Sequence, residues 1–148
     1  MSVWKVEFHC HTEYSRDGLT SIPSLLAAMT QRGIDRLVVT DHNSIRGALA
    51  AQQSDPERII VGEEILTTKG ELLAFFVQEE VPPMLEPEEA IRRLKDQGAF
   101  ISVSHPFDLS RSGWRVPDLV DILPEVDAIE VFNARCLNAE TNEMAARF

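Results

Sequence analysis

Two histidines near the N-terminus, His9 and His11, have the spacing of a metal site on a β-strand. They are separated by one residue, and alternate side chains of an extended strand leave the same face, so both imidazoles can reach one cation. Cys10 then points to the opposite face and is predicted to be a small core residue. The alternative for an isolated pair of this kind is two surface or hydrogen-bonded histidines on an edge strand.

Five further residues that could bind a metal lie at turns or at the ends of apolar runs. Asp17 precedes a glycine, His42 follows a second apolar run, Glu63 and Glu64 end a third, and His105 precedes a proline, which favours an extended backbone. Taken singly, each has an ordinary alternative: a turn residue, a histidine near a helix start, a solvated carboxylate or a partly buried histidine. Adjacent carboxylates on a strand face opposite ways, so only one of the glutamates is expected in the site.

The shared position of these residues is their strongest feature. All lie at or near the C-terminal ends of different strand-like runs, and such ends meet on one face of a parallel sheet or barrel. Core packing does not explain that coincidence. Mixed imidazole and carboxylate ligands suit Zn, Mn or Fe, and a set this rich predicts two or three cations that share a carboxylate bridge.

The elements that must carry these residues alternate along the chain. Apolar runs predict strands over Val3–Phe8, Arg36–Thr40, Arg58–Val61, Glu71–Val77, Ala99–Val103 and Ala128–Phe132. Cap residues and helical periodicity predict helices over Ser21–Gly33, Ser44–Gln53 with Asn43 or Ser44 as cap, Pro87–Gly98 and Asn138–Phe148. The Lys69-Gly70 turn predicts a hairpin inserted in the alternation. We therefore predict an α/β fold with a mainly parallel sheet of the TIM-like barrel type.

The composition restricts the class of protein. The chain has 148 residues, with 44% hydrophobic and 26% charged residues, which indicates one globular domain and excludes a disordered or fibrous chain. A net charge of -10 disfavours nucleic acid as a stable partner. Cys10 and Cys136 fit free thiols in a reducing compartment, and neither a membrane span nor a signal peptide is apparent, so we expect a cytoplasmic protein.

The potential ligands fall within short motifs that occur in a fixed order: His9-Cys10-His11-Thr12, Asp17-Gly18, Thr40-Asp41-His42-Asn43, Gly62-Glu63-Glu64 and Ser104-His105-Pro106. In this order and spacing the chain resembles the PHP (polymerase and histidinol phosphatase) family, and most closely its small stand-alone bacterial members. The resemblance covers residues 1–148 as one PHP domain. It implies a distorted (β/α)7 TIM-like barrel that holds up to three divalent metal ions, Mn, Fe or Zn, with Mg also allowed.

The resemblance implies particular ligands for the first metal. It puts His9 and His11 on that ion and makes Glu64 the bridge to a second ion. Glu63 is then expected on the solvent side.

The resemblance also implies the remaining ligands. The second metal would take His105 and Glu71, a position where many relatives have histidine; a carboxylate there favours Mn, Mg or Fe over Zn. The third metal would be held by Asp17 and His42.

Two more carboxylates are candidates for orienting the imidazoles. Asp41 adjoins a predicted metal-binding histidine, and Glu7 lies two residues before another. A hydrogen bond to the second ring nitrogen of a histidine fixes which nitrogen faces the metal.

The expected reaction is hydrolysis of a small phosphate ester, a nucleotide or another phosphorylated metabolite, by a hydroxide that the metals generate. The bound cations would reverse the local field of an acidic chain and attract the anionic substrate. Arg111 and Arg135 could clamp the phosphate, and Asn133 could orient the substrate. Each arginine could instead be a solvated surface charge, and Arg115 is a further candidate.

One family feature is absent. No Asp-x-His motif follows Arg135, so the chain is expected to lack two ligands and the last strands of the barrel. We expect truncation within a helix at Phe148; a remnant gene product or a barrel completed by another subunit are the alternatives. Two alternative functions remain. The first is an inactive metal-binding scaffold that self-associates through the open edge of the barrel. The second is a polymerase-associated proofreading module, which the negative charge of the chain disfavours.

Overall fold

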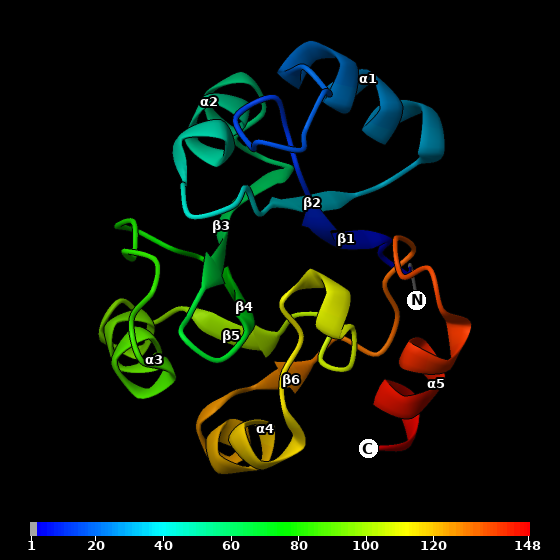
Figure 1. The fold of residues 1–148 in the computed structure, drawn as a ribbon. Coiled ribbons are helices and arrows are strands. Elements are labelled where there is room, and N and C mark those ends of the chain that lie inside the picture. Colours follow the sequence, from blue (N-terminus) through cyan, green and yellow to red (C-terminus); the bar gives the residue numbers. More distant parts are fainter. Residues whose placement is uncertain (1–2) are drawn as a thin grey trace.

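The computed structural model describes residues 3–148 and contains a strongly curved sheet with helices around its outer side (Figure 1). The strands are β1 (Val6–Cys10), β2 (Arg36–Val39), β3 (Ile59–Leu66), β4 (Glu71–Phe75), β5 (Phe100–Val103) and β6 (Ala128–Ile129). The α-helices are α1 (Ile22–Arg32), α2 (Arg46–Ser54), α3 (Pro87–Asp96), α4 (Val116–Ile122) and α5 (Ala139–Arg147). Two short 3-10 helices are η1 (Leu109–Arg111) and η2 (Leu123–Glu125).

The order of the strands in the sheet is their order in the chain. β1, β2 and β3 are parallel to one another, and β5 is parallel to β6. β4 lies between β3 and β5 and is antiparallel to both. The mainly parallel α/β half-barrel and its inserted hairpin are thus confirmed, whereas the seven-strand count stays a prediction.

Both faces of the sheet are apolar in its middle. On β4, Leu72 and Ala74 belong to the large core shared with the helices, while Leu73 and Phe75 form a smaller cluster on the inner face of the curve. Glu64 pairs with Leu73 across the β3–β4 ladder, and paired residues of an antiparallel ladder project to the same side. The Glu64 side chain therefore lies on the inner face.

Several helix boundaries agree with their sequence signals. Ser21 caps α1 by accepting a hydrogen bond from Ser24 N, and Gly33 ends it in the left-handed region at φ 63°. Pro87 opens α3, and Gly98 follows it with φ 73°. Within the described part of the chain, no helix has the length and apolar character needed to cross a membrane.

The predicted cap of α2 is confirmed only in part, since Ser44 Oγ accepts a hydrogen bond from Arg46 N at 3.3 Å but lies one residue before the cap position. The cap position is Ile45, which makes no side-chain hydrogen bond to the helix. Asn43 instead has φ 53°, and its side-chain oxygen accepts a hydrogen bond from Leu66 N at 2.9 Å. The residue thus joins the end of β2 to β3.

Strand boundaries also differ from the predictions. β1 is shifted toward its histidines, β3 continues through both glutamates to Leu66, and β6 ends at Ile129. Helix α4 was not predicted. Strand ends are set by which neighbouring backbone is available for pairing, and a single sequence does not contain that information.

Candidate metal centre

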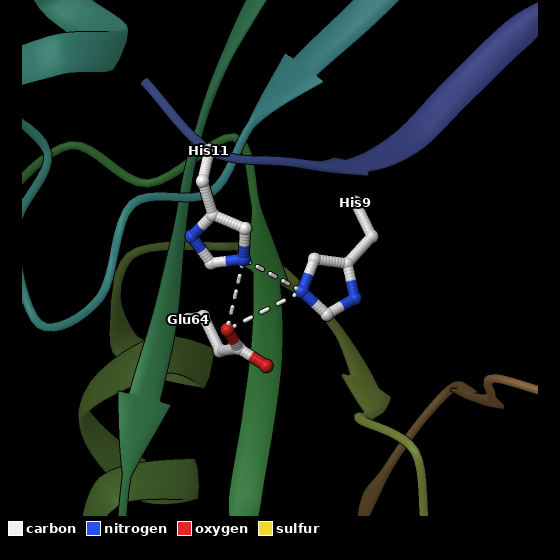
Figure 2. Close-up of side chains that lie close together, drawn as sticks. All are labelled: His9, His11 and Glu64. Atoms are coloured by element: carbon white, nitrogen blue, oxygen red, sulfur yellow. Dashed lines mark hydrogen bonds and ion pairs between the residues drawn. The ribbon is translucent and has the colours of Figure 1, made fainter. Parts of the chain in front are cut away.

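Glu64 lies at the centre of a cluster of imidazoles. It is fully buried in β3, and its backbone bonds to Asp41 O and Asn43 N extend the pairing of β2 with β3. Its Oε2 lies 3.3 Å from Nε2 of His9 and 3.2 Å from Nε2 of His11, as Figure 2 shows. Nδ1 of His42 lies 3.1 Å from the same oxygen. Three imidazole nitrogens therefore surround one carboxylate oxygen.

The second oxygen of Glu64 has different neighbours. Oε1 accepts a hydrogen bond from Ser104 Oγ at 2.6 Å and lies 3.1 Å from His105 Nε2. The same nitrogen is 3.3 Å from Glu71 Oε2, and Glu71 Oε1 is 3.6 Å from His42 Nδ1. Glu71 and His105 thus extend the cluster along the inner face of the sheet.

Asp17 completes the set, with its Oδ1 3.6 Å from His42 Nε2. Three groups of donor atoms are close enough to hold an ion: His9, His11 and Glu64; His11, Asp17 and His42; and His42, Glu64 and Glu71. The structure therefore brings together all seven residues predicted to bind metal. It differs from the expected grouping in that His42, as well as His105, lies beside Glu71.

The donor set fits divalent cations. Glu64 Oε2 is buried without a hydrogen-bond partner among the described residues, although three imidazoles face it. The Nε2 atoms of His9 and His11 lie 3.0 Å apart, a spacing suited to two lone pairs that share one ion. A buried, mixed imidazole and carboxylate set is what Zn, Mn or Fe requires.

Burial and close contacts shift the pKa values of this cluster in opposite directions. Burial lowers the pKa of His9, but hydrogen bonds to Glu130 and Glu64 outweigh it and raise the pKa to about 10. Burial likewise opposes the bonds of His105 to Glu64 and Glu71, which raise its pKa to about 9. For Glu64, burial raises the pKa, but the hydrogen bond to His105 and the close approach of His11 and His9 hold it well below its usual range. The Glu64 carboxylate is therefore ionised and attracts positive charge, which protons on the imidazoles or a bound cation can supply.

Asp41 acts on the imidazoles indirectly. It is fully buried, and its carboxylate accepts hydrogen bonds from Thr12 N and Oγ1, both at 2.7 Å, and from Ser15 Oγ at 2.8 Å. Ser15 Oγ in turn lies 3.2 Å from His11 Nδ1 and accepts from His42 N at 2.9 Å. Asp41 thus fixes a serine that faces two of the predicted ligands. A Cβ on Gly47 would overlap Asp41, so this network requires glycine there.

The expectation for Glu63 is wrong. The residue is fully buried on the face opposite Glu64, and its Oε2 accepts a hydrogen bond from Val81 N at 3.0 Å. Burial raises the pKa of Glu63 to about 8. Both faces of this sheet are covered, so the residue that points away from the site enters the protein interior instead of solvent.

The expected role of Glu7 is also contradicted. Its Oε1 accepts a hydrogen bond from the backbone N–H of His9 at 3.3 Å. The side chain is exposed, and among the described residues its hydrogen bond is to the backbone of His9. Glu7 therefore bonds to the strand and not to the ring of the histidine.

The three residues predicted to bind substrate lie beside the cluster. Arg111, Asn133 and Arg135 line a cavity of about 190 Å³ together with His9 and His11. Arg111 Nη1 donates to Asn133 Oδ1 at 3.1 Å, and Arg135 Nη1 donates to an Asp17 oxygen at 2.6 Å. Both guanidinium groups thus border the same cavity as the predicted ligands.

Sequence reasoning missed Glu130. Its carboxylate lies 2.9 Å from His9 Nδ1 and accepts a hydrogen bond from His105 N at 2.7 Å. The signal that could have found it is its position directly after β6, the same kind of position that singled out the histidines. Ser15 and Ser104 were also missed, because a serine near a strand end is common in turns.

Comparison with known proteins places the chain in a domain family. The sequence profile of the PHP domain matches residues 7–98. The chain is 32% identical to the uncharacterized protein MJ1587 of Methanocaldococcus jannaschii, over 95% of this chain and 88% of that protein. It is 34% identical to the uncharacterized protein MJ0417 of the same organism, over 97% of this chain but only 59% of that protein.

The fold also matches a solved structure. The crystal structure of a proposed metal-dependent phosphoesterase from Bifidobacterium adolescentis superposes with a TM-score of 0.76 over 99% of this chain and 83% of that one. The sequence identity is 15%, so this match concerns the fold alone. The profile match and the identity to MJ1587 decide the family. The chain belongs to the PHP domain family.

Proposed function

We propose that this protein hydrolyses a small phosphate ester with the help of divalent metal ions bound around Glu64. One observation carries the proposal. Nitrogen atoms of His9, His11, His42 and His105 all lie within 3.3 Å of the Glu64 carboxylate. Membership of the PHP family and the phosphoesterase proposed for the structural neighbour give this metal centre a reaction type.

The potential ions would share several of their donors. His9, His11 and Glu64 would hold a first ion, and Glu64 with Glu71 and His105 or His42 would hold a second. Asp17 and His42, with His11 nearby, would hold a third. Glu71 makes the second position rich in carboxylate oxygen, which favours Mn, Fe or Mg over Zn.

Bound divalent cations would supply Lewis-acid activation of a water and would neutralise the charge of the phosphate oxygens. The chain itself orients the substrate. The guanidinium groups of Arg111 and Arg135 border the cavity beside the imidazoles and could each donate to phosphate oxygens. Asn133 holds Arg111 in this position through its side-chain oxygen. The substrate would therefore be a phosphorylated metabolite or nucleotide small enough to enter this cavity.

The test is hydrolysis of p-nitrophenyl phosphate by the purified chain with Mn²⁺ and, separately, with excess EDTA. We expect turnover that depends on Mn²⁺. In Glu64→Gln, turnover should fall about 100-fold or more, because the variant lacks the negatively charged carboxylate that would bind the cations. Glu63→Gln is the matched control, since it changes the adjacent carboxylate on the opposite face, and it should keep turnover within about threefold. Equal losses in both variants, or activity that survives EDTA, would contradict the proposal.

A further inference from the structure

Glu130 is a largely buried carboxylate, and each of its two oxygens contacts a different histidine. Its side chain is 11% exposed. Oε1 lies 2.9 Å from Nδ1 of His9, and Oε2 accepts the backbone N–H of His105 at 2.7 Å. His9 belongs to β1, one edge of the sheet, while His105 follows β5 near the other edge. One carboxylate therefore joins the two sides of the metal centre.

The contact with His9 determines which ring nitrogen is available to a metal. An ionised carboxylate only accepts hydrogen bonds, so the ring nitrogen that faces it must carry the proton. With its proton on Nδ1, a neutral imidazole presents its lone pair on Nε2. In this structure Nε2 is the atom that faces His11 and Glu64.

The contact with His105 acts on the backbone. His105 has φ 21°, a conformation that side-chain-bearing residues rarely adopt. Such backbone geometry persists only where surrounding bonds enforce it. The bond from His105 N to Glu130 is one of those bonds, and it leaves His105 Nε2 within reach of Glu64 and Glu71.

Glu130 is itself held in place from the C-terminal side. Asn133 Nδ2 lies 3.2 Å from each Glu130 oxygen. Asn142 on α5 fixes the backbone of Asn133 with two bonds, accepting from its N–H at 3.0 Å and donating to its carbonyl at 3.1 Å. The carboxylate therefore cannot turn away from the histidines without breaking contacts that reach helix α5.

We propose that Glu130 is a positioning residue of the metal centre, which holds His9 with Nε2 toward the metal and holds the His105 backbone in its unusual conformation. The proposal rests on the proposed function only in taking His9 and His105 as metal ligands. Carboxylates that hydrogen-bond to metal-binding histidines contribute about 10- to 100-fold to metal affinity.

The first test compares Mn²⁺ binding by Glu130→Gln and by the wild-type chain, using titration calorimetry. A glutamine side chain has one acceptor oxygen where glutamate has two, so either His9 or His105 must lose its acceptor. We expect affinity to fall about 10- to 100-fold with the number of bound ions unchanged. Glu7→Gln is the control, because it removes the same charge from a carboxylate that accepts a hydrogen bond from the His9 backbone and not from its ring, and its affinity should stay within about twofold.

Two results would overturn the proposal. Wild-type affinity in Glu130→Gln would show that Glu130 does not position the ligands, and the loss of one whole ion would show that Glu130 is a ligand itself. Binding is measured without any phosphate ester, so a chain that binds Mn²⁺ normally but hydrolyses no phosphate ester would contradict the proposed function and not this inference.

A second measurement needs no variant and so does not depend on Glu130→Gln folding. In the ¹⁵N NMR spectrum of the Zn²⁺-loaded wild-type chain, His9 should carry a proton on Nδ1 that is protected from exchange, with Nε2 bound to the metal. Zinc bound at Nδ1 of His9 would overturn the proposal.

Discussion

Arg111 and Arg135 reach the candidate metal centre with different partners. Arg111 donates to the neutral amide oxygen of Asn133, whereas Arg135 donates to the carboxylate of Asp17. A phosphate that replaces Asn133 as the acceptor breaks no ion pair, while one that binds Arg135 competes with Asp17. Arg111 is therefore the guanidinium better prepared to bind substrate.

This difference predicts the effect of Arg111→Ala on the proposed hydrolysis. A hydrogen bond between charged groups contributes about 1.5–3 kcal/mol, so KM for p-nitrophenyl phosphate should rise about 10- to 100-fold. Arg115→Ala is the matched control, because that arginine is exposed and does not line the cavity. Steady-state kinetics of both variants would check this. An equal rise in KM for Arg115→Ala would show that the loss of any positive charge, and not a specific contact of Arg111, weakens substrate binding.

At the residue scale, spacing was sufficient for two candidate ligands at the end of one strand, His9 within β1 and His11 directly after it. Their Nε2 atoms lie 3.0 Å apart, as expected from the local rule that alternate residues of an extended backbone share a face. The same rule left Glu63 and Glu64 undecided, and it could not show that the second face of β3 is also covered. Glu130 was missed because its partners, His9 and His105, are distant in sequence and the contact depends on how far the sheet curls.

Among the elements, the start of β4 depends on a close approach between a glycine and a tryptophan. Trp114 is fully buried, and its indole N–H donates to the carbonyl of Glu71 at 3.0 Å. A Cβ on Gly70 would overlap the indole ring. The tryptophan therefore fixes the backbone of a predicted ligand from outside the cluster.

We expect Gly70→Ala to lower the free energy of unfolding by about 1–3 kcal/mol, because the added methyl group must displace a large buried ring. Urea denaturation measures this change. Lys69→Ala, at the next position of the same turn, should change it by less than about 0.5 kcal/mol, since its nearest carboxylates lie 3.9 Å away at the surface. A Gly70→Ala variant as stable as the Lys69→Ala variant would contradict this role of Trp114.

The elements were predictable to the extent that their signals are local. Ser21 and Gly33 delimit α1, and Lys69-Gly70 marks the turn between β3 and β4, because caps and tight turns depend on a few adjacent residues. Helix α4 has only seven residues, too few for a clear helical period. β6 ends at Ile129 although apolar residues continue, since its pairing with β5 ends there.

For the whole molecule, the candidate metal centre connects the two edges of the open sheet. Its donors come from β1, from the loop after β2, from the β3–β4 hairpin and from the segment after β5, and the loop after β6 passes beside β1 (Figure 1). A ligand that binds only the folded arrangement stabilises it in proportion to its saturation.

Mn²⁺ should therefore raise the free energy of unfolding, by about 2.7 kcal/mol for each independent site at a free concentration of 100 times Kd. Thermal denaturation with Mn²⁺ and with EDTA measures the effect as a shift of Tm. Glu64→Gln should lose most of the shift, while Glu63→Gln should keep it. A shift of the same size in both variants would place Mn²⁺ binding elsewhere on this acidic chain.

The agreement between strand order and chain order has a consequence for how the protein is synthesised. Each strand can pair with the one before it as soon as it emerges from the ribosome, since these contacts are short in sequence. The contact between His9 and Glu130 spans 121 residues, and closing so long a loop has a larger entropy cost than pairing neighbouring strands. Most of the sheet can therefore form before Asn133 and Asn142 are available. We therefore expect the proposed metal centre to reach its full affinity only after Asn133 and Asn142 have taken their places.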